Sequence, residues 1–89
     1  MDILWDEKKN KKLKDTRGVS FEDVARIILD KKYLAILENP SHPEQMIFVL
    51  SYNAYTYVVP FVVDDDDNIV LKTVFPSRKF HKIYGKEKR

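Results

Sequence analysis

The chain has 89 residues, of which 44% are hydrophobic and 12% aromatic, and its formal net charge is +2. This size and composition predict a single globular domain over residues 1–89, with one hydrophobic core. The sequence has no cysteine, which excludes disulfides, thiolate metal ligands and cysteine nucleophiles. It has no signal-peptide pattern and no apolar run near the roughly 20 residues of a membrane helix, so we expect a cytoplasmic protein without a membrane partner.

The charges are segregated along the chain. Residues 1–18 carry six Lys/Arg and four Asp/Glu, residues 19–70 carry three and nine, and residues 71–89 carry seven and one. Basic ends therefore flank an acidic middle. A basic patch attracts polyanions through their phosphates, although lysines that are simply solvated give the same composition.

The first predicted elements are a short strand over residues 3–5 and a lysine-rich helix. Asp6 is a favourable N-cap, and the helix is expected to run to about Thr16 with Leu13 as its one strong apolar anchor. Gly18 is the expected stop, because glycine tolerates the left-handed backbone that often ends helices.

A second helix is predicted to begin at once, with Ser20 as its cap and acidic residues in its first turn. It ends at residues 30–32, and a strand over 33–37 and a proline-containing loop over 38–45 follow. Apolar residues at spacings of three and four give this helix a buried face: Phe21, Val24, Ala25, Ile28 and Leu29.

Three runs of β-branched and aromatic residues, at 46–52, 55–63 and 68–75, predict an antiparallel meander. Asn53-Ala54 and the acidic turn 64–67 separate them. Pro60 lacks an N–H for the ladder and therefore marks a bulge, a kink or an edge. Tyrosines around the first hairpin (Tyr52, Tyr55 and Tyr57) either stack bases or form cross-strand pairs.

A short C-terminal helix is predicted between Ser77 and Gly85. The order β-α-α-β-β-β-β plus this helix predicts an α+β two-layer sandwich with an antiparallel sheet. The helices are expected to cover one face of the sheet, which leaves the other face open unless a partner covers it.

No cofactor or metal site is predicted. His42 and His81 lie in different segments, and the acidic turn lacks the pattern of a calcium loop. His42, between two prolines, is interpreted as a loop residue fixed by its neighbours, with a functional role as the alternative. The sequence also contains no GxSxG motif and no phosphate-binding glycine loop.

The basic segment after the last strand is the remaining candidate for chemistry. RNA can be cleaved without metal when its 2′-hydroxyl attacks the adjacent phosphate, and this needs cations and proton carriers. The alternative is that Phe80, Ile83 and Tyr84 anchor the segment while its cations are solvated. The catalytic candidates are Arg78, Lys79, His81 and Tyr84, and the RNA-binding candidates are Lys72, Lys82 and Lys86.

The run WDEKKNKKLKDTRGVSFEDVARIILD (5–30) resembles the opening of the BrnT-like toxins of type II toxin–antitoxin systems. Its elements are Trp-Asp, a Lys/Asn-rich helix, a basic residue with Gly, then Val-Ser-Phe-Glu-Asp and an apolar helix. The resemblance continues more loosely through Pro40, His42 and the final SRKFHK. It implies a RelE-like fold, a ribonuclease that inhibits translation, and a cognate antitoxin that silences it. DNA would be bound only indirectly, through the antitoxin.

Arg78 is the residue that matches the family pattern, and by this resemblance it clamps the phosphate. Our hypothesis adds Lys79 and Lys82 to hold flanking phosphates, His81 to transfer protons, and Tyr84 to orient His81 or to pack. Two departures from the family pattern leave catalysis weakened, redistributed onto His81, Lys79 and Tyr84, or lost. Thr73 stands where the family has a basic residue, with Lys72 beside it on the opposite face of a strand. Pro60-Phe61 stands where the family is polar. The alternatives are a non-catalytic binding module and a structural domain that pairs with itself.

Overall fold

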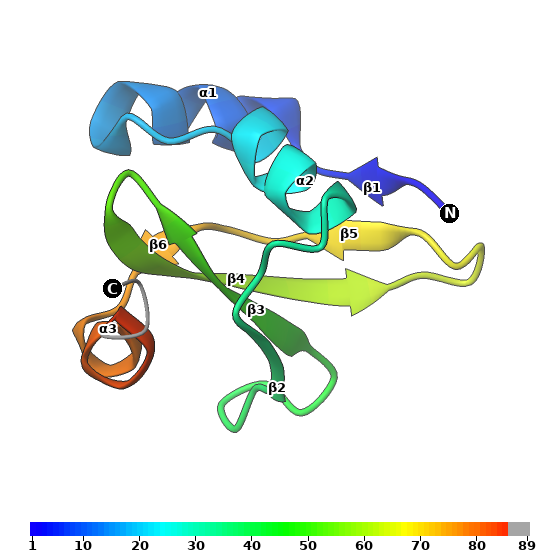
Figure 1. The fold of residues 1–89 in the computed structure, drawn as a ribbon. Coiled ribbons are helices and arrows are strands. Elements are labelled where there is room, and N and C mark those ends of the chain that lie inside the picture. Colours follow the sequence, from blue (N-terminus) through cyan, green and yellow to red (C-terminus); the bar gives the residue numbers. More distant parts are fainter. Residues whose placement is uncertain (86–89) are drawn as a thin grey trace.

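The computed structural model describes residues 1–85 and places three helices and six strands within them (Figure 1). In chain order these are β1 (Ile3–Leu4), α1 (Glu7–Arg17), α2 (Phe21–Leu29), β2 (Ala35–Glu38), β3 (Met46–Tyr52), β4 (Tyr55–Val63), β5 (Ile69–Leu71), β6 (Phe75–Pro76) and α3 (Arg78–Tyr84). The predicted α+β fold is confirmed.

One sheet contains all six strands, in the order β1-β5-β4-β3-β2, with β6 also paired to β4. The β2–β3–β4–β5 pairings are antiparallel, as predicted. The exception is β1, which lies parallel to β5 with Ile3 opposite Ile69. The strand predicted at 33–37 is observed as β2, which starts two residues later and ends one residue later.

The helix ends follow from their capping residues. The side chain of Asp6 accepts a hydrogen bond from the N–H of Lys8, and Ser20 and Ser77 cap α2 and α3 in the same way. Gly18 ends α1 in the left-handed conformation, with φ of 67°. These four predicted ends are confirmed.

α1 and α2 cover one face of the sheet, and the main core lies between them and the central strands (Figure 1). Its buried residues are Leu13, Val19, Phe21, Val24, Ile28, Phe48, Leu50, Val59, Phe61, Leu71 and Val74. Burial of these apolar side chains is the main force that holds the helices to the sheet.

α3 packs on the opposite face of the sheet (Figure 1). Phe80 and Tyr84 of α3 contact a second apolar cluster made by Ile47, Val49 and Val58. The expectation that this face is open is therefore wrong for the part over β3 and β4. The chain covers that part itself, because the short helix presents two aromatic side chains on one side.

The strand predicted over residues 68–75 is divided into β5 and β6. Phe61 lies opposite Leu71 and Val58 opposite Phe75, so the two residues 59–60 of β4 face the three residues 72–74. One extra residue of this kind is a β-bulge. The carbonyl of Pro60 accepts a hydrogen bond from the N–H of Lys72 at 2.8 Å. Proline has no N–H, so Pro60 cannot donate a hydrogen bond to this neighbouring segment in return. Of the three alternatives that Pro60 predicted, a bulge, a kink or an edge, the structure shows the bulge.

Candidate functional site

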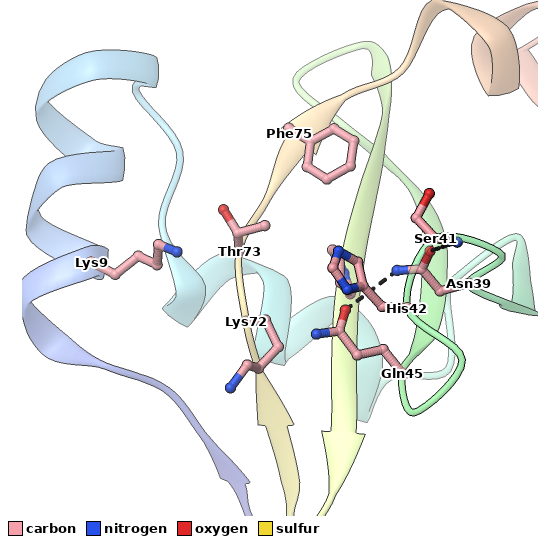
Figure 2. Close-up of a pocket in the computed structure, with 9 residues that line it drawn as sticks. Lys9, Asn39, Ser41, His42, Gln45, Lys72, Thr73 and Phe75 are labelled. Atoms are coloured by element: carbon pink, nitrogen blue, oxygen red, sulfur yellow. Dashed lines mark hydrogen bonds between the residues drawn. The ribbon is translucent and has the colours of Figure 1, made fainter.

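A surface cavity of about 500 Å³, here the central hollow, lies beside this bulge (Figure 2). Lys9 of α1 lies on one side of it and the loop after β2 lies on the other, with the bulged segment between them. The lining residues are Lys9, Asn39, Ser41, His42, Gln45, Pro60, Lys72, Thr73 and Phe75. None of these lining residues is acidic.

The loop between β2 and β3 is closed by its own hydrogen bonds. The Asn39 side chain accepts from the N–H of Ser41 at 3.1 Å and donates to the Gln45 side chain at 3.3 Å (Figure 2). The N–H of His42 donates to the Asn39 carbonyl, and the N–H of Gln45 donates to the His42 carbonyl. These bonds present the His42 imidazole to the hollow. Its Nδ1 lies 3.9 Å from the exposed Glu44 carboxylate.

The bulge brings Lys72 and Thr73 to the same hollow. Neighbours in a regular strand point to opposite faces, but residues 72–74 lie outside the strands, and both Lys72 and Thr73 line this hollow. Lys72 is thus placed next to the position where the family resemblance expects a basic side chain. With Lys9, it gives the central hollow two cations.

His81 is held on the α3 side of β4 and does not line the central hollow. Its Nδ1 is 2.9 Å from the hydroxyl of the buried Thr56, and its ring stacks on Tyr55 with centroids 4.1 Å apart. A Cβ at Gly85 would lie 2.8 Å from the ring. Contacts on several sides therefore fix the orientation of this imidazole.

The other predicted residues of α3 have different surroundings. Arg78 and Lys82 are exposed, whereas Tyr84 packs beside Phe80 with ring centroids 6.1 Å apart. The ammonium of Lys79 lies 5.5 Å from the centre of the Phe80 ring. Lys86 lies outside the described residues.

Lys79 also lines a second cavity of about 370 Å³, here the α3 hollow. The α3 hollow shares Asn39, Pro60 and Phe75 with the central hollow, so the two are neighbours. Of the predicted site residues, the structure thus brings Lys72 into the central hollow and Lys79 next to it. Lys9, Asn39 and Gln45 were not predicted, since nothing in their local sequence distinguishes them from other loop and helix-surface residues.

The tyrosines of the first hairpin form cross-strand pairs. Tyr52 lies opposite Tyr55, and its ring centroid is 5.5 Å from that of Tyr57. The Tyr52 hydroxyl donates to the Asp23 carboxylate at 2.6 Å and accepts from the N–H of Ser20 at 3.1 Å. Partial burial, and secondarily this bond to Asp23, raise the pKa of Tyr52 above its ordinary value. Tyr52 thus joins the start of α2 to the sheet.

No protein-family model and no curated protein sequence matches the chain. Among solved structures, the chain is similar to the Brucella abortus ribonuclease toxin BrnT, with a TM-score of 0.65 and 18% identity. The match covers 86% of this chain and 96% of that one. The chain has a BrnT-like fold. The resemblance seen in residues 5–30 is confirmed at the level of fold.

Two further observations concern the part of the BrnT-like fold that is described. None of its helices combines the length and the apolar character required to cross a bilayer. Nor do three or more histidine, aspartate or glutamate side chains gather at one place within residues 1–85 in a way that suits a metal ion.

Proposed function

We propose that residues 1–89 form a single toxin-like domain, the toxin of a type II toxin–antitoxin system, which cleaves RNA without metal and inhibits translation in the cytoplasm. The observation that best supports this proposal is the central hollow on a BrnT-like fold. There an imidazole and two lysines line one cavity, and none of the lining residues is acidic. Such a cavity attracts a phosphodiester and offers it a proton carrier.

In the proposed reaction the RNA 2′-oxygen forms a bond to the adjacent phosphorus, and the bond from phosphorus to the 5′-oxygen breaks. A base takes the proton of the 2′-hydroxyl, and an acid gives a proton to the departing 5′-oxygen. His42 is the proton carrier that lines the hollow. Lys9 and Lys72 stabilise the extra negative charge on the phosphorane.

The α3 residues have supporting roles in this proposal. Arg78 clamps the phosphate, since guanidinium can bind two phosphate oxygens at once, and Lys79 and Lys82 hold flanking phosphates. His81 is the second candidate for proton transfer. With Nδ1 held by Thr56, Nε2 is the atom that exchanges the proton. Tyr84, packed against Phe80, supports α3.

The proposed partners are an RNA substrate and a cognate antitoxin that silences the toxin. Any contact with DNA is made by the antitoxin. A short neighbouring reading frame with a DNA-binding pattern, whose product restores growth when it is co-expressed, is the expected result.

The test is induced expression of the wild type beside Arg78→Ala, His42→Ala and His81→Ala, with growth and total RNA followed over time. We expect growth arrest and new RNA ends in the wild type and loss of both in Arg78→Ala and His42→Ala. Lys12→Ala, an exposed lysine of α1 that does not line the hollow, is the matched control and should stay toxic. The thermal unfolding midpoint of Arg78→Ala should match that of the wild type, because this side chain is exposed.

Purified protein separates cleavage from binding. We expect cleavage of single-stranded RNA in the presence of a chelator, with 2′,3′-cyclic phosphate ends. A toxic Arg78→Ala protein would contradict the role of Arg78. RNA that is bound by the folded wild type but stays intact would indicate a non-catalytic binding module.

A further inference from the structure

Phe75 is an exposed aromatic side chain that lines three neighbouring cavities. It belongs to the two-residue strand β6 and is 37% exposed. It lines the central hollow, where Figure 2 shows its ring, and it also lines the α3 hollow. It also borders a third cavity of about 660 Å³, the Arg17 hollow, which is lined by Arg17, Tyr57, Phe75 and Pro76.

The backbone around Phe75 is held although its ring is exposed. Phe75 pairs with Val58 of β4, and the N–H of Ser77 donates to the Thr56 carbonyl at 3.0 Å. On the other side, the Arg17 guanidinium donates to the Val74 carbonyl at 3.0 Å. The ring is thus presented from a fixed frame, and little conformational entropy is lost when a flat ligand binds to it.

Cations lie on both sides of this ring. Lys9 and Lys72 line the central hollow and Arg17 lines the Arg17 hollow. Neither of these two cavities has an acidic lining residue, whereas Glu38 lines the α3 hollow. Lys9 and Arg17 both belong to α1, so each of the two cavities is lined by a cation of the same helix, and Phe75 lines both cavities. Isolated exposed apolar side chains are common, but an aromatic ring between two cationic cavities has the features of a site for single-stranded nucleic acid.

We propose that Phe75 is a stacking platform for one nucleobase of single-stranded RNA, which runs from the central hollow to the Arg17 hollow. The inference rests on the proposed function, because it places the substrate of that same site. The base stacks on the ring, and the phosphates on either side of it meet Lys9 and Lys72 in one cavity and Arg17 in the other. Every base has a π-face, so the platform tolerates different bases but requires an unpaired one.

The test measures binding of a 2′-O-methyl RNA of about eight nucleotides, a length within the known site sizes of single-strand binders. This RNA has no free 2′-hydroxyl and is not cleaved, so the affinity does not depend on catalysis. Fluorescence anisotropy should show binding about 10- to 100-fold weaker for Phe75→Ala and for Phe75→Leu, because stacking is lost in both. Phe75→Trp should bind at least as tightly as the wild type.

Two controls make the result specific to stacking. Ile83→Ala removes another exposed apolar side chain, on α3, and should leave the affinity unchanged. The same oligonucleotide without its bases should bind the wild type and Phe75→Ala equally. The wild type contains only Trp5, so the extra tryptophan fluorescence of Phe75→Trp reports on position 75. The intact RNA should quench this extra fluorescence, and the abasic RNA should not.

The outcomes separate the two proposals. If Phe75→Ala binds the 2′-O-methyl RNA as tightly as the wild type, the ring serves another partner, such as a protein, and the platform is wrong. If only the aromatic variants bind tightly, the platform is supported. The platform then stands even where unmodified RNA is left intact, a result that would contradict the proposed ribonuclease alone.

Discussion

Asn10 shows how one buried polar side chain connects two helices. It is 1% exposed, and its amide oxygen accepts from the N–H of Phe21 at 2.8 Å. Its amide nitrogen donates to Glu22 at 2.9 Å and to Glu7 at 3.4 Å. The first N–H of α2 therefore finds its partner on α1. Local sequence does not indicate this role, because the partners of Asn10 on α2 are 11 and 12 residues away.

Asn10→Ala should lower the free energy of unfolding by about 1–3 kcal/mol, because the buried N–H of Phe21 loses its acceptor. Urea denaturation followed by circular dichroism measures this change. Lys11→Ala, an exposed neighbour on α1, should change stability by less than about 0.5 kcal/mol. Equal effects of the two substitutions would show that the amide is not structural.

Glu22 links this contact to pH. The hydrogen bond from Asn10 is the largest cause that lowers the pKa of the Glu22 carboxyl from its ordinary value of 4.5. A lowered pKa contributes stability that is present above the unfolded value and lost as the pH falls through the folded value. Glu22→Gln should therefore weaken the acid dependence of unfolding below about pH 4.5. Asn10→Ala should have the same effect, and an unchanged acid profile in both would contradict the linkage.

At the scale of elements, the ends of helices and the bulge differ in how they are encoded. The caps at Asp6, Ser20 and Ser77 bond to N–H groups two or three residues away, so the sequence predicts them. Pro60 predicts an irregularity but does not say which strand contains the extra residue. That depends on the register of residues 58–61 against 71–75, which pairing across the sheet determines.

Substitution by alanine should destabilise the protein at each of the two glycines that end helices, but for different reasons. Gly18 has φ of 67° and nothing within 4 Å of an added Cβ, so Gly18→Ala is opposed only by backbone strain of about 1–2 kcal/mol. Gly85 has φ of −63°, but its added Cβ would lie 2.8 Å from the His81 ring. Gly85→Ala should therefore displace that ring from Thr56.

A double-mutant cycle separates these causes. His81→Ala should remove most of the extra destabilisation caused by Gly85→Ala, because the clash disappears. The same His81→Ala background should leave the effect of Gly18→Ala unchanged, since the two sites share no contact. Additive effects at Gly85 would mean that His81 does not limit that position.

At the scale of the whole molecule, the fold gathers basic residues that are distant in the sequence. Lys9 from α1 and Lys72 from the bulge meet at one cavity, although the sequence separates them by most of the chain. Composition indicates basic ends, but only the fold shows that parts of both ends meet. His42 was interpreted as a loop residue, and it is one. Its place in the cavity depends on how the β2–β3 loop lies beside Pro60 and the bulge.

RNA affinity should therefore fall linearly in a plot of log affinity against log salt. Lys9→Ala and Lys72→Ala should each reduce the slope by about 0.7, the contribution of one phosphate contact on a single strand. Lys12→Ala, which does not line the central hollow, should leave the slope unchanged. Titrations of the 2′-O-methyl RNA at several salt concentrations measure these slopes, and equal slopes for all three variants would argue against a phosphate track at this cavity.

The parallel pairing of β1 with β5 also determines when the sheet can be completed during synthesis. The N–H of Asp2 donates to the Asn68 side chain across 66 residues of sequence, and the N–H of Ile69 donates back to the Asp2 carbonyl. At roughly 5–20 residues per second, the first strand waits about 3–13 s on the ribosome before its partner is made. The bulge and β6 follow β5 in the chain, so the central hollow can form only after them. The nascent chain of the proposed ribonuclease thus lacks the central hollow until most of the chain has been translated.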